Sequence, residues 1–254
     1  MLQQTQAARV AAAYPAFLRR FPTVRALAAA TRGEVIAAWS GLGYNRRALA
    51  LAEAARAIVA RHAGRVPRDV ADLRALPGVG PYTAAAVASI AYGEPIPAID
   101  VNLRRVVARA RLGADDAAAS ANDIAEAAAR WIDRRDPGAW NQALMDVGRE
   151  HCRAVPRCGG CPLRRRCRFV RAGAPLAERR ARPAPFEGST RQARGAVLRA
   201  VAGGARTIGA LRGATALPAR RLLPAIRSLD RDGLLRAGPA ALRGASSGRV
   251  HPAP

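Results

Sequence analysis

The amino-acid sequence predicts an all-α fold, from its composition and from the periodicity of its hydrophobic residues. Half of the 254 residues are hydrophobic but only 4% are aromatic. Alanine-rich stretches with few β-branched runs favour helix over sheet. Hydrophobic residues recur at helical spacing through most of residues 1–150, and glycine and proline interrupt the pattern. Helices are therefore predicted at about 3–20, 23–30, 33–39, 45–62, 69–75, 80–92, 101–111, 120–134 and 138–151.

The rest of the chain divides into smaller parts. All four cysteines fall in a segment at 152–170, which follows the helical domain at 1–151. Residues 171–189 are rich in Arg, Ala and Pro and are typical of a linker. A helix–turn–helix pattern then predicts a small winged-helix-like module at 190–243, with helices near 191–202, 208–211 and 219–232. The tail at 244–254 is predicted to be disordered.

The charge of the chain points to a polyanionic partner. Lys and Arg together number 42 against 18 Asp and Glu, a formal net charge of +24. This balance favours nucleic acid, because neutralised phosphates release counterions. Every basic residue is arginine, so a compositional bias is the alternative explanation. The absence of lysine excludes a lyase that attacks the sugar through a lysine side chain.

Two sequence features bear on the cellular compartment: a membrane-spanning run and a secretory signal. No run of about 18 apolar residues could span a membrane. The segment from Met1 to Gln6 lacks the pattern of a secretory signal, and a cytoplasmic location is expected. In that compartment four cysteines are more often metal ligands than disulfide partners.

A tight glycine turn joins two predicted helices at Leu76–Ala84, which reads LPGVGPYTA. Gly78 and Gly80 permit positive φ angles and let the backbone approach a ligand closely. The N–H groups that open the second helix favour an anion, and a DNA phosphate suits the charge of the chain. An ordinary turn between packed helices is the alternative. The predicted DNA-binding residues here are Gly78, Val79, Gly80 and Tyr82.

An aspartate follows the hairpin at the start of another predicted helix. The string PAIDVNLRRVVAR, which contains Asp100, begins 17 residues after Gly80. Asp100 could simply cap that helix. Together with LPGVGPYTAAAV, however, this string resembles the helix-hairpin-helix DNA glycosylase superfamily. The resemblance implies that Asp100 faces the sugar C1′ and stabilises the positive charge that develops as a base departs. It also places Asn102 beside DNA.

Three further features resemble the MutY branch of this superfamily. Endonuclease III-like members carry a lysine at the position of Tyr82, and MutY-type members lack it. The strings MLQQTQ and WSGLGYNRRA resemble MutY strings in which the residue at Gln4 inserts into the duplex and the residue at Tyr44 wedges beside 8-oxoguanine. The string NQALMD also precedes the cysteines in that branch. Gln4 on a solvent-facing helix surface and Tyr44 as a surface aromatic are the alternatives.

The resemblance implies a monomeric, monofunctional base-excision repair enzyme. It would flip adenine out of a duplex and hydrolyse its N-glycosidic bond when adenine is mispaired with 8-oxoguanine or guanine. An endonuclease III-like pyrimidine glycosylase is one rival, which the missing lysine and Tyr82 oppose. A non-catalytic protein that binds DNA lesions or mismatches is another.

The sequence departs from the MutY pattern at both ends. The glutamate that protonates adenine in that family would lie two positions upstream of Met1, so an N-terminally truncated chain or a start assigned at an internal methionine is expected. The residues after 185 are too few for the Nudix-like domain that recognises 8-oxoguanine in many MutY proteins. Recognition of the lesion is therefore left open.

Cys152, Cys158, Cys161 and Cys167 are separated by five, two and five residues. Four thiolates at this spacing can close around one metal centre, and both [4Fe–4S] and tetrahedral zinc fit. The resemblance favours [4Fe–4S], although the first gap is one residue shorter than in the family. The surrounding arginines would present charge to phosphates; they are Arg153, Arg157, Arg164, Arg165, Arg166 and Arg168.

Overall fold

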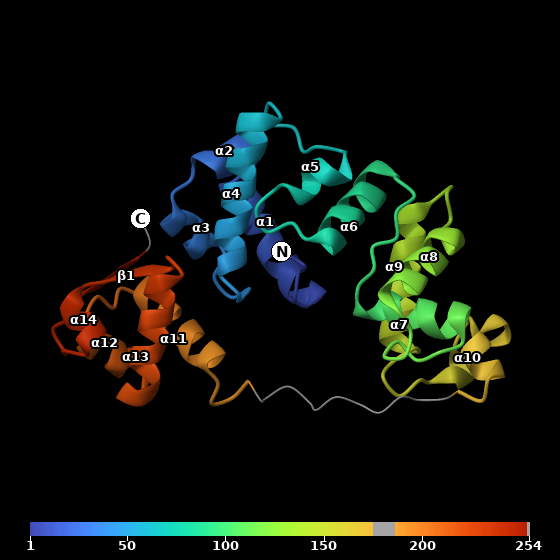
Figure 1. The fold of residues 1–254 in the computed structure, drawn as a ribbon. Helices are drawn as coiled ribbons and strands as arrows, with labels where there is room; N and C mark the ends of the chain where they lie inside the picture. The colour runs from blue at the N-terminus through green and yellow to red at the C-terminus, as the bar shows by residue number, and fades with distance from the viewer. Residues whose placement is uncertain (175–185, 253–254) are drawn as a thin grey trace. The chain divides into compact units, whose positions relative to one another are not determined.

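A computed structural model describes residues 1–174 and 186–252. The chain forms two compact units, one of residues 1–65 together with the chain from 182 onward, and one of residues 66–181. Each is helical apart from a two-stranded sheet near the C-terminus (Figure 1), and the predicted all-α fold is confirmed. Most of the predicted linker lies at 175–185, outside the described residues. Every described helix is too short or too polar to cross a membrane.

Four helices fold the N-terminal part of the first unit: α1 (Ala7–Arg20), α2 (Val24–Ala29), α3 (Arg32–Ala38) and α4 (Arg46–Arg61). Phe17 and Trp39 pack edge to face at the centre of their core, with ring centroids 6.0 Å apart. Thr31 and Glu34 form a capping box that fixes the start of α3. The first helix begins at Ala7 rather than at the predicted position 3, because residues 3–5 form a turn.

The C-terminal module contains α11 (Thr190–Ala202), α12 (Ile208–Thr215), α13 (Ala219–Arg231), β1 (Leu235–Ala237), α14 (Pro239–Arg243) and β2 (Val250–Pro252). Val197, Leu211 and Ile226 are buried in its core. The strands pair antiparallel, with Ala237 opposite Val250. The sequence predicted a disordered tail from 244, whereas residues 250–252 form a strand because they complete this sheet.

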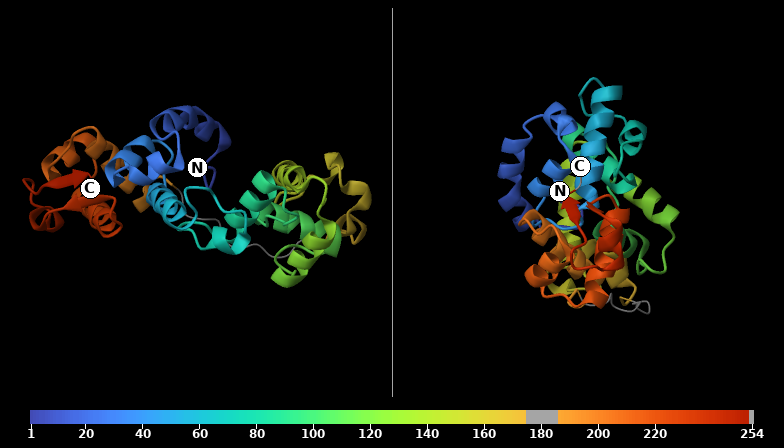
Figure 2. Two further views of the ribbon diagram at one scale, coloured as in Figure 1. Left: turned by 90° about the horizontal axis from the view of Figure 1, so that it is seen from above. Right: turned by 90° about the vertical axis from the view of Figure 1, so that its left-hand side faces the viewer.

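The second unit carries α5 (Val70–Arg74), α6 (Pro81–Tyr92), α7 (Val101–Val107), the π-helical turn η1 (Ala108–Leu112), α8 (Ala121–Trp131), α9 (Pro137–Glu150) and α10 (Arg168–Arg171). Two short 3-10 turns, η2 (Cys158–Gly160) and η3 (Arg164–Arg166), lie between α9 and α10. Helix α7 lies against both α8 and α9 (Figures 1 and 2). Leu103, Val107, Ile124 and Leu144 form the core between them.

Candidate active site and metal centre

The predicted hairpin joins α5 to α6 and is largely exposed. Gly78 has a φ of 74°, which glycine adopts without strain. Gly80 does not use this freedom, since its φ is −85° and it caps α6 in an extended conformation. The first hydrogen bond within α6 runs from the Ala84 N–H to the Gly80 carbonyl, 2.9 Å away. The N-terminal end of α6, with its partial positive charge, is thus presented on an exposed loop.

Asp100 caps α7 and is partly buried. Its Oδ1 accepts from the backbone N–H groups of Asn102 and Leu103, at 2.9 and 2.7 Å. Its Oδ2 accepts from Asn102 Nδ2, at 2.8 Å. The capping role and the predicted catalytic role are compatible, because accepting hydrogen bonds from backbone N–H groups does not neutralise a carboxylate. Asn102 lies beside Asp100 and orients it; contact between Asn102 and DNA remains a prediction.

Tyr82, from the hairpin end of α6, lies within electrostatic reach of Asp100. Burial raises the pKa of the Tyr82 hydroxyl, and the negative charge of Asp100 raises this pKa further. The hydroxyl also contacts Met145 Sδ on α9, at 3.6 Å. Tyr82 is 38% exposed. Tyr82 therefore places a neutral phenol, with no amine, near the candidate catalytic carboxylate at physiological pH.

Asn141 on α9 holds the extended segment that leads into Asp100. Its side chain is fully buried. The amide nitrogen donates to Ser89 Oγ and to the carbonyls of Ile96 and Pro137, and the amide oxygen accepts from the Ala98 N–H at 2.8 Å. A buried amide with this set of bonds fixes one backbone path. The NQALMD string gives no sign of this role of Asn141.

A chain of hydrogen bonds connects Asp100 to the cysteine segment. Arg105 on α7 donates through Nη2 to Asn102 Oδ1 and to the Gly148 carbonyl, both at 3.0 Å. Its Nε donates to the Cys152 carbonyl. Asn102 in turn bonds Asp100. Arg105 has no signal in the sequence beyond being one of two adjacent arginines after the motif. These hydrogen bonds couple the position of the cysteine segment to the position of Asp100.

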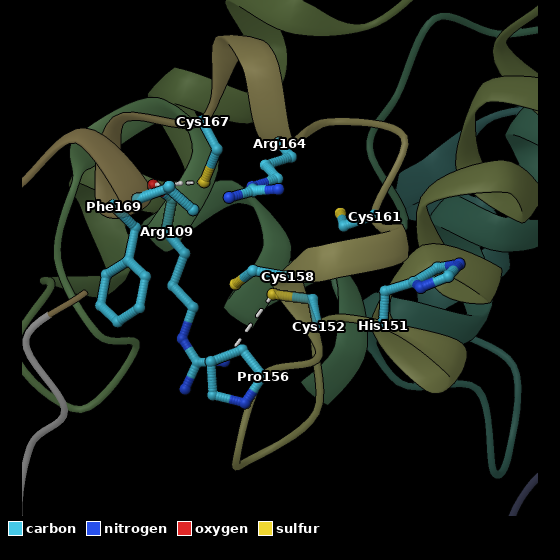
Figure 3. A pocket seen from close by; sticks show the side chains of 10 residues that line it. Arg109, His151, Cys152, Pro156, Cys158, Cys161, Arg164, Cys167 and Phe169 are labelled. Atoms are coloured by element: carbon cyan, nitrogen blue, oxygen red, sulfur yellow. Dashed lines mark hydrogen bonds between the residues drawn. The ribbon is translucent and has the colours of Figure 1, made fainter. Parts of the chain in front are cut away.

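The four cysteines line one pocket (Figure 3). Arg109, His151, Arg164 and Phe169 also line it. All four cysteines are partly buried, and burial raises the pKa of the Cys152 and Cys161 thiols. A bound metal would favour the thiolate form, and would so oppose the effect of burial on these pKa values. The donor set and its convergence on one pocket therefore fit a thiolate-bound metal centre. Within 1–174 and 186–252, no three His, Cys, Asp or Glu side chains are grouped closely enough for a single ion.

A buried ion pair supports one wall of this pocket. Arg109 is 2% exposed, and its guanidinium donates twice to Asp115 Oδ1, at 3.0 and 2.8 Å. It also donates to the Arg153 and Ala154 carbonyls and contacts Cys152 Sγ at 3.7 Å. The guanidinium lies over the Phe169 ring, 5.1 Å from its centroid. Arg109 therefore joins η1 to the backbone that follows Cys152. This role of Arg109 was not predicted from the sequence.

The comparisons with known proteins decide the family. A model described as "HhH-GPD superfamily base excision DNA repair protein" matches residues 1–134.

The chain belongs to this superfamily.

Its relatives in the HhH-GPD superfamily include adenine DNA glycosylases. Those of Mycolicibacterium smegmatis and Mycobacterium tuberculosis are each 45% identical over 78% of this chain, which spans 68% and 66% of their lengths. The human adenine DNA glycosylase is 41% identical over 66% of this chain and 32% of its own length. The resemblance to MutY-type glycosylases is confirmed.

Solved structures of the same superfamily share the fold. A thermostable thymine-DNA glycosylase has a TM-score of 0.62 and is 28% identical, over 67% of this chain and 80% of that one. An endonuclease III in a non-covalent complex with DNA has a TM-score of 0.58 and is 26% identical, over 68% of this chain and 80% of that one. The helix-hairpin-helix glycosylase fold predicted from the sequence is therefore confirmed.

Gln4 and Tyr44, the two predicted duplex-probing residues of this HhH-GPD protein, are held near one another in the first unit. Arg47 donates to the carbonyls of Gln3 and Gly43, which adjoin them in the chain. Gln4 and Tyr44 have φ angles of 55° and 48°, and both are exposed. Residues other than glycine adopt such backbone angles uncommonly. Gln4 lies in a turn rather than on a helix.

Gly148 lets α9 approach the start of α7, and we predict that Gly148→Ala displaces the candidate catalytic segment. An added Cβ would lie 2.5 Å from Asn102 Cβ and 3.0 Å from Asn102 Cα. Overpacking of this kind costs about 1–3 kcal/mol. Thermal unfolding should show the loss, and base release should slow because Asn102 orients Asp100.

Gly213→Ala is the matched control for that substitution. Gly213 lies within helix α12, and an added Cβ there would meet nothing within 4 Å. Alanine favours helix over glycine, so this variant should be as stable as the parent or slightly more stable. Equal behaviour of the two variants would contradict the close approach of α7 and α9.

Proposed function

We propose that the protein is a monofunctional DNA glycosylase that removes adenine mispaired with 8-oxoguanine or guanine. The observation that carries this proposal is the 45% identity to adenine DNA glycosylases over 78% of the chain. The geometry supports it, because Asp100 follows the hairpin and Tyr82 lies within its electrostatic reach. DNA phosphate would bind the exposed hairpin at the N-terminal end of α6.

In the proposed reaction the bond between sugar C1′ and adenine N9 breaks, and a water oxygen bonds to C1′. The departing adenine takes up a proton. Positive charge develops on the sugar as the bond breaks, and the Asp100 carboxylate stabilises it. Asn102 holds this carboxylate in place through the bond to Oδ2. Tyr82 offers no amine to form a Schiff base, so the DNA backbone would stay intact.

Gln4 and Tyr44 would act on the duplex rather than on the sugar. An extruded adenine leaves a gap in the base stack, which inserted side chains can fill. Both residues are exposed, and both have left-handed backbone conformations. We assign Gln4 to the gap and Tyr44 to the base opposite adenine, in line with the resemblance.

We propose that Cys152, Cys158, Cys161 and Cys167 hold a [4Fe–4S] cluster. The support is that the four cysteine sulfurs line one pocket, and that the resemblance to MutY-type glycosylases implies a [4Fe–4S] cluster rather than tetrahedral zinc. The cluster would supply a structural centre that fixes the segment between α9 and α10. Six arginines at 152–170 are exposed and would face phosphate: Arg153, Arg157, Arg164, Arg165, Arg166 and Arg168.

A panel of duplexes tests the proposed function. The full chain is mixed in excess with duplexes carrying 8-oxoguanine:adenine, guanine:adenine, thymine:adenine or an oxidised pyrimidine, and base release is measured in a single turnover. We expect adenine release from the first two duplexes only, with strand breaks seen only after alkali. Release of the oxidised pyrimidine, or breaks without alkali, would instead indicate an endonuclease III-like activity. Selective binding without release would indicate a non-catalytic lesion-binding protein.

A further inference from the structure

The C-terminal module has the architecture of a winged helix. Helices α11, α12 and α13 pack around one core, with α12 and α13 joined by a short turn (Figure 1). The chain then forms β1 and β2, and an isolated bridge pairs Thr207 with Arg249 beside them. In helix–turn–helix proteins the helix after the turn enters the DNA major groove while neighbouring elements contact the backbone. Helix α13 holds that position here.

The two faces of α13 differ sharply. Leu222, Ala225, Ile226 and Leu229 are fully buried against the module. On the opposite side an exposed stripe follows the helical repeat of three and four residues; it consists of Arg220, Pro224, Arg227 and Arg231. We call these residues the α13 stripe. The apolar face of α13 packs in the core, so the α13 stripe faces away from the core and is available to a partner.

The module carries a large excess of positive charge. Residues 190–252 contain twelve arginines and only two acidic residues, Asp230 and Asp232. Both aspartates are engaged inside the module, since Asp230 accepts from the Ala237 N–H at 2.9 Å and Asp232 pairs with Arg194 at 2.7 Å. No acidic side chain of the module is therefore left to neutralise the stripe.

The arginines of the stripe differ in their bonds. Arg227 donates to the Leu242 carbonyl, at 3.0 and 2.8 Å, and so also supports α14. The side chains of Arg220 and Arg231 make no hydrogen bond or ion pair with any other described residue. These two guanidinium groups can reach a partner without breaking an internal contact. Their spacing of eleven residues places them about 16 Å apart along a helix.

We propose that the α13 stripe binds the phosphate backbone of double-stranded DNA. This contact would add to those of the hairpin and the cysteine segment, and it rests on the proposed function only in that DNA is the substrate. Charge complementarity favours a polyanion, and arginine pairs with phosphate through two parallel hydrogen bonds. Phosphate contacts carry no sequence information, which suits a protein that must search undamaged DNA.

The test compares the full chain with the double variant R220A/R231A. Binding to an undamaged duplex is measured by fluorescence anisotropy at several salt concentrations. Each lost phosphate contact lowers the salt slope by about 0.9, so we expect a slope reduced by about 2 and binding roughly tenfold weaker at low salt. Both positions are exposed, so thermal unfolding should be unchanged.

The control variant R191A/R199A removes the same charge from α11 in the same module. If only net charge matters, the two variants will weaken binding equally, and the proposal is then overturned. An unchanged Kd and salt slope in R220A/R231A would overturn it as well. A selective loss in R220A/R231A supports the stripe.

The test of the α13 stripe can be interpreted whether or not the proposed glycosylase activity is found. With the protein at saturating concentration, R220A/R231A should release base at the parent rate, because the stripe lies outside the candidate active site. Undamaged-duplex binding can be read even if the parent releases no base. A slower release at saturation would contradict a purely binding role for Arg220 and Arg231.

Discussion

Replacing Asp100 with asparagine is expected to slow adenine release by a factor of about 10² to 10³, the effect of losing one electrostatic stabiliser of a transition state. Asparagine also caps helices well, so α7 should keep its start. What is lost is the negative charge near the developing sugar cation. Single-turnover release from an 8-oxoguanine:adenine duplex measures the rate, and DNA affinity should stay within about twofold.

Asp69→Asn is the matched control. Asp69 caps α5 as Asp100 caps α7, accepting from the N–H groups of Ala71 and Asp72 at 2.8 and 3.1 Å. Asp69 is exposed, and it lies before the hairpin rather than after it. This variant should release adenine at the parent rate. If both variants were equally impaired, the loss in Asp100→Asn would not be specific to the Asp100 carboxylate, and its assigned role would be contradicted.

Asp115→Ala is expected to lower the free energy of unfolding by about 3–5 kcal/mol, the cost of leaving a buried charge without its partner. Arg109 would remain in the pocket wall, 2% exposed, without the carboxylate that now accepts two of its hydrogen bonds. Urea unfolding followed by circular dichroism measures the loss. The visible absorbance of the metal-loaded protein should also decay faster, because Arg109 holds the backbone after Cys152.

The control for this ion pair is Glu126→Ala. Glu126 pairs with Arg130 at 3.1 Å on α8, but both side chains are about two-thirds exposed. Exposed pairs contribute about 0–1 kcal/mol, so this variant should unfold nearly as the parent does. Losses of similar size in the two variants would show that burial does not increase the contribution of the Arg109–Asp115 pair to the free energy of unfolding.

The features predicted most fully from the sequence depend on neighbours along the chain. The helices of residues 23–151 follow from local hydrophobic spacing and lie close to their predicted bounds. Asp100 begins its helix as a capping residue should, because a cap bonds only to the next two or three N–H groups. The four cysteines occupy 16 residues, so a short segment suffices to bring them to one pocket.

Other features were decided only by contacts between distant segments. Asn141 bonds Ser89, 52 positions away, and a polar side chain within a helix gives no sign of such a partner. Arg109 and Asp115 are near neighbours in sequence, yet their burial depends on Phe169 and on the backbone after Cys152. The sequence shows that Gly78 and Gly80 both permit a positive φ, but only the folded hairpin decides that Gly78 adopts one while Gly80 is extended.

The sequence by itself therefore determined the helices, the hairpin, the cysteine set and the family resemblance. Tertiary structure decided how Asp100 is supported, how the pocket wall is built and which face of α13 is exposed. The physical reason is that hydrogen-bonded caps and hydrophobic spacing act over a few residues. Burial and the satisfaction of buried polar groups depend on which remote segments pack together.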